Sequence, residues 1–260
     1  MNDPTAIPRR EKLERLKERK GTPLISALTA YDYAVARLLD EAGIEIILVG
    51  DSLGMMVFGH EDTTQVTIEM MSHHVNACRN GVRNALLVAD LPYRSYETPD
   101  AAVTAASRLA EAGADAVKLE GGREVLPQAE SIMRSGIAVI GHIGMLPQQV
   151  KQEGGYKKKG KTEIEAKSLI SDATELAAAG VNALVLENIV AGIAREITST
   201  VTVPTIGIAS GEDCDGQILV INDLLGSYPW FCPGFAKPRA SLASETSLAA
   251  KTFIDGLNKG

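Results

Sequence analysis

The chain is poor in the residues and runs that mark several protein classes. Among its 260 residues are three cysteines and one tryptophan, and aromatic residues make up 4%. The cysteines (Cys78, Cys214 and Cys232) contain no C-x-x-C pair, which argues against a disulfide framework or a zinc knuckle and for a reducing compartment. No apolar run approaches the roughly 20 residues of a membrane span, and the N-terminus lacks the apolar core of a signal peptide. We therefore expect a cytoplasmic protein with no membrane partner.

The chain also has fewer basic than acidic residues, 26 against 33. The net charge is −7, so the composition does not favour binding to nucleic acid or to an anionic membrane. Hydrophobic residues make up 45% and charged residues 23%, which is typical of a globular protein with a large core. We see no interdomain linker and no low-complexity tract, so residues 1–260 are predicted to form a single domain.

What is present is an alternation of strand-like and helix-like patterns. The apolar runs typical of buried parallel strands are 23–29, 44–50, 84–90, 114–120, 137–143, 183–187, 203–209 and, less clearly, 217–221. Helical patterns occupy 33–43, 67–81, 98–113, 162–180 and 188–200, and Thr98 and Thr162 have the character of helix N-caps. Eight such strands predict an α/β fold of the (β/α)8 TIM barrel type, with an extra helix over 9–20 and one or two helices after Ser241. A doubly wound sheet is the main alternative, but the G-x-G-x-x-G turn expected after its first strand is missing.

Four of the strands share a further pattern, in which a Gly precedes the apolar run and an acid ends it. The four pairs are Gly43 with Asp51, Gly81 with Asp90, Gly113 with Glu120, and Gly180 with Glu187. The carboxyl ends of barrel strands meet at one mouth, where active sites of this fold lie. A single acid in such a place is as readily a helix cap, whereas four at one level indicate a site.

The chemistry of these acids suggests a division of roles. Asp51 and Asp90 end neighbouring strands and supply the hard oxygen ligands that Mg²⁺ prefers, and Glu120 could complete the shell directly or through water. Lys118 points to the same face as Glu120 and could neutralise a substrate carboxylate or a developing enolate, with an internal salt bridge to Glu120 as the alternative. Glu187 is placed to act as a general base apart from the metal ligands.

Longer motifs resemble one family closely. They are TAYDYAVA (29–36), VGDSLGM (49–55), GHEDTTQVT (59–67), ADLPYRSY (89–96), AVKLEGG (116–122), VIGHIGMLPQ (139–148), GGYKKKGK (154–161), VLEN (185–188), IGIASG (206–211) and CDGQILVINDLLG (214–226). In this order and spacing they resemble ketopantoate hydroxymethyltransferases, whose fold is a (β/α)8 barrel of the phosphoenolpyruvate/pyruvate type.

The resemblance implies an activity and a set of roles. The activity is transfer of a hydroxymethyl group from 5,10-methylenetetrahydrofolate to 3-methyl-2-oxobutanoate, forming ketopantoate for pantothenate and coenzyme A biosynthesis through a Mg²⁺-stabilised enolate. By resemblance, Asp51 and Asp90 hold Mg²⁺ with support from Glu120, and with Ser52 and Lys118 they form the substrate site. Glu187 is then the proton acceptor. The resemblance also implies a homo-oligomer, commonly a decamer.

Several roles stay open at this point. His142 could bond substrate or a neighbouring acid, and His60 could shape a lid. The segment 154–161 could be a solvated loop or contact the folate tail or a phosphate, and it is more basic than is usual in the family. Two other functions remain alternatives. A carbon–carbon lyase of the wider barrel group would need a mobile-loop Cys, and none follows the fifth strand before Cys214. A non-catalytic relative would have lost one of the site residues.

Overall fold

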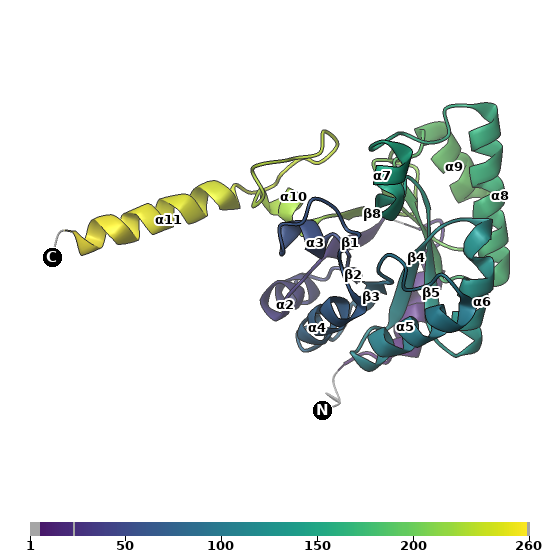
Figure 1. Cartoon of the computed structure of the whole chain (residues 1–260), viewed down its shortest axis with the longest axis horizontal. Coiled ribbons are helices and arrows are strands. Elements are labelled where there is room, and N and C mark those ends of the chain that lie inside the picture. Colours follow the sequence, from purple (N-terminus) through teal and green to yellow (C-terminus); the bar gives the residue numbers. More distant parts are fainter. Residues whose placement is uncertain (1–5, 23, 259–260) are drawn as a thin grey trace. The chain divides into compact units, whose positions relative to one another are not determined.

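The computed structural model describes residues 6–22 and 24–258, and it contains a closed barrel of eight parallel strands in the order β1 to β8 (Figure 1). The strands are β1 (Ile25–Thr29), β2 (Ile46–Val49), β3 (Leu86–Asp90), β4 (Ala116–Glu120), β5 (Ala138–Gly144), β6 (Ala183–Glu187), β7 (Thr205–Ile208) and β8 (Gly216–Leu219). The predicted (β/α)8 barrel is confirmed.

The predicted strand boundaries agree with the structure to within two residues at each end. In the last strand, the predicted 217–221 includes Ile221, which instead begins helix α10 (Ile221–Leu225). Pro23, the first residue of the predicted 23–29 strand, lies outside the described residues.

The main helices alternate with these strands, and several begin where their capping residues predict. The long helices are α1 (Arg9–Glu18), α2 (Tyr33–Glu41), α4 (Ile68–Arg79), α5 (Pro99–Glu111), α6 (Leu126–Arg134), α8 (Glu163–Ala179) and α9 (Ala191–Thr200). The short ones are α3 (Leu53–Met56), α7 (Val150–Glu153), η1 (Arg123–Val125) and η2 (Pro147–Gln149). Thr98 accepts a hydrogen bond from Ala101 N, and Thr162 forms a capping box with Glu165. The sequence did not predict helix α6, because its nine residues carry only a short apolar pattern; Pro127, in its first turn, is compatible with a helix start.

The glycines that precede the strands are required for different structural reasons. Gly180 lies at φ 102° and ends α8 in the left-handed conformation that favours glycine. Gly81 has no positive φ, and a Cβ there would lie 2.7 Å from Tyr33 O. The shared Gly-strand-acid pattern therefore combines helix termination with close packing of α2 against the end of α4.

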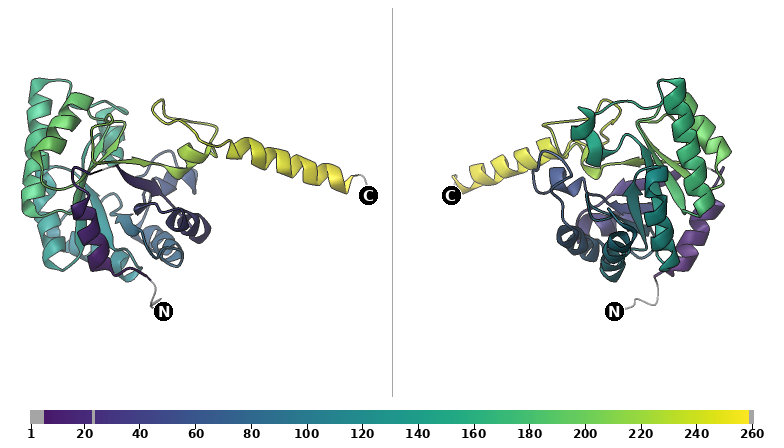
Figure 2. Two further views of the ribbon diagram at one scale, coloured as in Figure 1. Left: turned by 180° about the vertical axis from the view of Figure 1, so that it is seen from behind. Right: turned by 45° about the vertical axis from the view of Figure 1, so that its right-hand side comes forward.

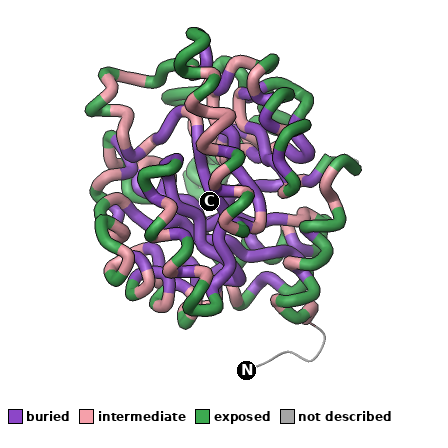
Figure 3. Tube along the Cα trace, turned by 90° about the vertical axis from the view of Figure 1, so that its right-hand side faces the viewer, coloured by how far each residue is buried: buried purple, intermediate pink, exposed green. Residues whose placement is uncertain are grey.

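Side chains inside the barrel form apolar layers that begin at the N-terminal ends of the strands. The interior cluster contains Ile25, Ala27, Ile46, Leu48, Leu86, Val88, Ala116, Ala138, Ile140, Ala183, Val185, Ile206 and Ile218. Buried backbone accordingly runs through the strands at the centre of the molecule, whereas exposed backbone lies on outer turns (Figure 3). Alternate residues of the same strands, such as Ile47 and Leu87, are fully buried against the helices.

Helix α1 closes the N-terminal end of the barrel, as the predicted extra helix over 9–20 (Figure 2). Leu16 belongs to the interior cluster. Lys12, only 3% exposed along its side chain, pairs with Asp115 at 3.2 Å. Both apolar and ionic contacts thus fix α1 to the barrel.

The described residues divide into two compact units, up to Ile218 and from Leu219 onward. The second unit contains α10 and α11 (Leu242–Leu257), and α11 buries none of its own residues. A single domain over 1–260 stays a prediction. Within the described ranges, no helix has the length and apolar character needed to cross a membrane.

Candidate active site at the barrel mouth

The candidate site is the layer of inward-facing side chains at the C-terminal ends of the barrel strands. In β3 the interior residues Leu86 and Val88 are followed two residues later by Asp90. The same spacing leads to Lys118 and Glu120 in β4, to His142 in β5 and to Glu187 in β6. Because side chains two residues apart share a face of a strand, the apolar core ends in a ring of ionisable groups.

Asp51 and Asp90 meet where β2 and β3 end. Asp51 N donates to Asp90 Oδ2 at 3.0 Å, and both residues are buried. Burial, together with the charge of Asp90, raises the pKa of Asp51 to about 7. The two carboxylates therefore repel each other unless a cation lies between or beside them.

Lys118 pairs with an acid on the neighbouring strand. Its Nζ lies 3.0 Å from Asp90 Oδ1, and the two residues are register partners in β3 and β4. Burial alone would disfavour the ammonium, but the charges of Asp90, Glu120 and Asp51 outweigh it and raise the pKa of Lys118. Lys118 thus stays cationic inside the site.

His142 lies between this lysine and Glu187. Lys118 Nζ is 3.1 Å from His142 Nδ1, and an ammonium can only donate, so Nδ1 accepts and Nε2 carries the ring proton. Nε2 lies 3.1 Å from Glu187 Oε2, without the alignment of a hydrogen bond. Burial and the charge of Lys118 lower the pKa of His142 well below its ordinary value, which keeps the ring neutral. Of the two roles open for His142, the structure shows contact with neighbouring acids.

Glu187 is the most accessible acid of the ring. Its side chain is 17% exposed, compared with 2% for Glu120. Burial raises the pKa of Glu187 from 4.5 to about 7, against the opposing charge of Lys118. A carboxylate with such a pKa is suited to accept a proton near neutral pH.

Glu120 is held by residues to which the sequence expectation gave no role. Gln148 N, from the turn after β5, donates to Glu120 Oε2 at 3.0 Å, and Gln148 Nε2 donates to Asp51 Oδ2 at 2.9 Å. The hydroxyl of Tyr96 donates to Gln148 Oε1 at 2.6 Å. Burial raises the pKa of the Tyr96 hydroxyl, which therefore keeps its proton.

Ser52 borders the acids on the side of β1. Its Oγ lies 2.9 Å from the hydroxyl of Tyr31, and Thr29 Oγ1 donates to the same hydroxyl at 3.0 Å. Asp32, by contrast, caps α2 by accepting from Val35 N, as its sequence position predicts. Ser52 is thus placed at the mouth by a short chain of hydroxyl groups.

This layer contains more acidic than basic groups, and the excess of negative charge indicates whether a cation would fit there. When ionised, Asp51, Asp90, Glu120 and Glu187 carry four negative charges against the single ammonium of Lys118. Among the residues described, Glu120 Oε1 is buried and has no hydrogen-bond partner. Buried uncompensated carboxylates are costly, and a divalent cation would offset the excess.

The donor set favours a cation that keeps several open positions. Across residues 6–22 and 24–258, no three His, Cys, Asp or Glu side chains converge as ligands of one metal ion. Two aspartates with remaining positions for water and substrate are a common arrangement for Mg²⁺. Asp51 and Asp90 fit this arrangement, with Glu120 one step removed.

All the predicted site residues therefore lie together at the mouth: Asp51, Ser52, Asp90, Lys118, Glu120 and Glu187. Their individual roles stay predictions. Lys118 pairs with Asp90, whereas the internal salt bridge considered from the sequence was with Glu120. Gln148 and Tyr96 are the additions. Both lie in the quoted motifs, and a glutamine beside Pro147 directly after a barrel strand was the one signal of a role.

The basic loop 154–161 is tied to its own surroundings. Lys159 pairs with Glu153 at 2.6 Å, and Lys158 donates to Ala209 O at 3.2 Å. His60 stacks on Phe58, with ring centroids 5.7 Å apart. Lys158 and Lys159 are thus both held by oxygen atoms of the protein itself.

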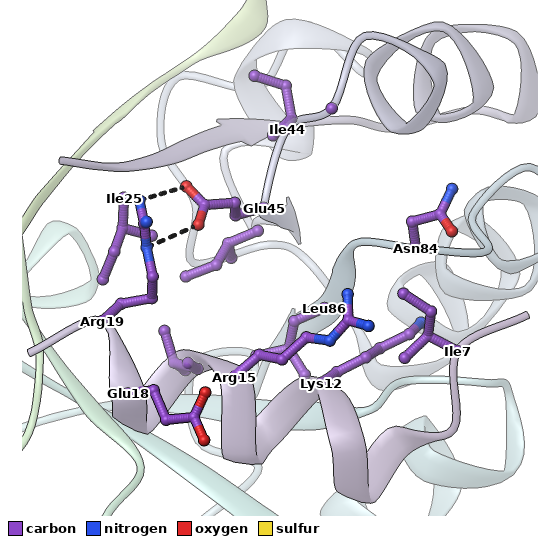
Figure 4. Close-up of a pocket in the computed structure, with 13 residues that line it drawn as sticks. Ile7, Lys12, Arg15, Glu18, Arg19, Ile25, Ile44, Glu45, Asn84 and Leu86 are labelled. Atoms are coloured by element: carbon purple, nitrogen blue, oxygen red, sulfur yellow. Dashed lines mark hydrogen bonds and ion pairs between the residues drawn. The ribbon is translucent and has the colours of Figure 1, made fainter. Parts of the chain in front are cut away.

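A cavity of about 370 Å³ lies at the opposite end of the barrel, beside α1 (Figure 4). Apolar side chains such as Leu16 and Leu86 line it together with charged ones. Two of the charged groups that line it pair with each other, since Arg19 lies 3.0 Å from Glu45. We assign no chemistry to this cavity.

The closed barrel with its acid-lined mouth defines a (β/α)8 TIM barrel. Two solved structures share this fold: 2,3-dimethylmalate lyase, itself a member of the phosphoenolpyruvate mutase/isocitrate lyase superfamily, and phosphonopyruvate hydrolase in complex with oxalate and Mg²⁺. The lyase has a TM-score of 0.61 and 17% identity, over 97% of this chain and 99% of its own. The hydrolase has a TM-score of 0.66 and 14% identity, over 94% and 88%.

Sequence comparison is more specific. The model of the ketopantoate hydroxymethyltransferase family matches residues 10–260. A 3-methyl-2-oxobutanoate hydroxymethyltransferase of Trichodesmium erythraeum (strain IMS101) is 51% identical over 91% of this chain and 90% of its own. The enzyme of that name from Syntrophus aciditrophicus (strain SB) is 49% identical over 91% and 88%. The chain belongs to the ketopantoate hydroxymethyltransferase family.

Proposed function

We propose that this protein transfers a hydroxymethyl group from 5,10-methylenetetrahydrofolate to C3 of 3-methyl-2-oxobutanoate, with Mg²⁺ as the metal, to form ketopantoate. Family membership supports the reaction. The observation that carries the mechanism is the presence of two kinds of acid at the mouth. Asp51 and Asp90 are joined through Asp51 N, whereas Glu187 is the more accessible acid, lies against His142 and has a pKa raised to about 7.

The 2-oxo acid is anionic, and the site offers it one cation and one hydroxyl. Lys118 keeps its positive charge, and Ser52 Oγ stands at the edge of the same layer. We assign both to substrate binding, together with Asp51 and Asp90. Mg²⁺ held by Asp51 and Asp90 would supply Lewis-acid polarisation of the 2-oxo group and lower the barrier to enolate formation.

Glu187 then removes the proton from C3. Its pKa, raised to about 7 by burial, lies in the range in which a general base works best. His142, with its ring proton on Nε2, lies 3.1 Å from this carboxylate. Lys118 opposes the negative charge that develops on the substrate oxygen as the proton leaves C3.

The new carbon–carbon bond forms between C3 and the one-carbon unit of the folate. C3 supplies the electron pair of the new bond, and both bonds from the methylene carbon to the folate nitrogens N5 and N10 break. Water supplies the hydroxyl oxygen of the product and one of the two protons that these nitrogens gain. The folate brings the one-carbon chemistry, while the protein supplies position and charge. Glu187, protonated by the first step, can return its proton to the departing nitrogen or to water.

The test is product formation by the purified protein. It is incubated with 3-methyl-2-oxobutanoate and either 5,10-methylenetetrahydrofolate or formaldehyde, with and without Mg²⁺, and ketopantoate is measured by mass spectrometry. We expect ketopantoate only when Mg²⁺ is present. Failure to form it from either donor would overturn the assignment.

A half-reaction isolates the proposed base. In D₂O without a one-carbon donor, the C3 hydrogen of 3-methyl-2-oxobutanoate should exchange for deuterium, as followed by proton NMR. Glu187→Gln should abolish this exchange, and the matched surface variant Glu196→Gln, on exposed α9, should not. Exchange at the original rate in Glu187→Gln would assign the base to another group.

A further inference from the structure

Gln148 joins more parts of the mouth than any of the predicted residues. It is 4% exposed and lies in η2, directly after β5. Its side-chain Nε2 donates to Asp51 Oδ2 and to Leu91 O, both at 2.9 Å. Its backbone N donates to Glu120 Oε2 at 3.0 Å. One residue thus contacts acids that follow β2 and end β4, as well as the backbone after β3.

The orientation of the Gln148 amide is fixed by what surrounds it. Both hydrogens of Nε2 are used, because Nε2 faces two oxygen acceptors. The amide oxygen accepts from the hydroxyl of Tyr96 at 2.6 Å. A flipped amide would face its oxygen toward Asp51 Oδ2 and Leu91 O, and both contacts would become repulsive. The acceptors Asp51 Oδ2 and Leu91 O thus fix the donor face of the amide, and the hydroxyl of Tyr96 stabilises that orientation by donating to the amide oxygen.

This arrangement restrains two carboxylates at once. Gln148 engages one oxygen of Asp51 and one oxygen of Glu120, so neither group can rotate without losing a buried hydrogen bond. The remaining oxygen of Glu120 is buried and, among the described residues, has no hydrogen-bond partner. Gln148 therefore fixes each carboxylate through one oxygen, so that the other oxygen keeps a defined position toward a cation.

We propose that Gln148, oriented by Tyr96, is a positioning residue that fixes Asp51 and Glu120 for the divalent cation. The inference rests on the proposed function, in which these acids face Mg²⁺, and it extends that function to a loop that contacts no metal itself. A purely structural role, in which Gln148 only anchors the turn after β5, is the opposing explanation. The two differ in whether the affinity for the cation changes when the protein stays folded.

The experiment is titration of the metal-free protein with MgCl₂ in a calorimeter, without substrate. Gln148→Met keeps the length of the side chain and removes its hydrogen bonds, and it should weaken Mg²⁺ binding about 10- to 100-fold. Tyr96→Phe removes only the hydroxyl that orients the amide, and about a three- to tenfold loss is expected. Gln152→Met is the matched control, since Gln152 lies in α7, which directly follows η2, and donates to Tyr93 OH on the exposed side.

A second measurement separates positioning from loss of structure. If Gln148 positions the acids, raising the MgCl₂ concentration should restore most of the rate of ketopantoate formation in Gln148→Met, and the unfolding temperature should change little. An affinity for Mg²⁺ equal to that of the unchanged protein in Gln148→Met would overturn the inference while leaving the proposed reaction intact. If that variant does not fold, Tyr96→Phe decides in its place, and an unchanged affinity there overturns the inference. An unchanged protein that binds no Mg²⁺ would overturn both the inference and the metal in the proposed function.

Discussion

Acids stand at both ends of this barrel, and their surroundings differ. At the N-terminal end, Asp115 accepts from Lys12, Arg79 and Leu87 N. Asp215 accepts from Lys20, Gly21 N and Thr205. The acids of the mouth share one lysine among four carboxylates, and burial raises the pKa values of Asp51 and Glu187 to about 7.

The difference shows what each set does. An acid with a full complement of donors stabilises the fold and has little tendency to change its protonation state. An acid that lacks donors costs stability and is retained where a cation, a substrate or a proton can use it. Position at the mouth and lack of partners coincide here, so experiments are needed to separate them.

The largest effect is expected for Glu187→Gln. The change keeps the shape of the side chain and removes the base, so the rate of ketopantoate formation should fall about 10²- to 10⁴-fold. Because the substitution removes a buried charge, the unfolding temperature should not fall. Rates at saturating Mg²⁺ and thermal unfolding measure the two outcomes. A variant that unfolds more easily but retains its rate would place Glu187 with the structural acids.

The opposite outcome is expected for Asp115 at the closed end. Asp115→Ala leaves the ammonium of Lys12, which is 3% exposed, without its buried counter-charge. Breaking such a pair costs about 3–5 kcal/mol of unfolding free energy. Adding Lys12→Met should recover part of the loss, because the pair is then replaced by an apolar contact. Urea denaturation measures these differences, and the rate per folded molecule should be unchanged in both variants.

A smaller effect is expected in the metal-free protein, where the acids at the two ends should make the folding stability depend on pH in opposite ways. The pKa of Glu187 in the folded state, about 7, is above its ordinary 4.5, so folding is favoured while it is protonated and loses stability as the pH rises between those values. For Asp215, burial alone would raise the pKa, but the hydrogen bonds from Lys20, Thr205 N and Gly21 N outweigh it and lower the pKa below 3.8. Its contribution is present above 3.8 and is lost as the pH falls further.

The corresponding variants should therefore respond in opposite directions. With a chelator present, Glu187→Gln should raise the unfolding temperature at pH 7.5 and have no such effect at pH 4. Asp215→Asn should lower it at pH 6, and the difference should narrow below about pH 4. Parallel curves for the two variants would contradict the contrast between the ends.

Much of this contrast could be predicted from the sequence. Strand positions follow from apolar runs, and the acids that end β3, β4 and β6 continue the inward-facing alternation of their strands. What the sequence could not provide is contact between strands, because the register that places Lys118 opposite Asp90 is a tertiary property. Gln148 lies in a turn without periodicity, so no pattern pointed to its bonds with Asp51 and Glu120. The excess of negative charge at the mouth could be recognised only once the closed barrel had brought the four acids together.

The smallest effect is expected for Asp62. This acid distinguishes the effect of lying at the mouth from the effect of lacking hydrogen-bond donors. It follows β2 and so lies on the mouth side, yet it has donors, because Thr64 N donates to it at 2.8 Å and Lys151 pairs with it. The hydrogen bond from Lys151 and those from Thr64 lower its pKa to about 2, as for an acid of the closed end. Since Lys151 is 62% exposed, Asp62→Asn should shift the unfolding temperature by no more than about 3 °C and the rate less than about threefold. A rate loss comparable to that of Glu187→Gln would mean that position at the mouth, rather than the lack of partners, decides which acids serve the reaction.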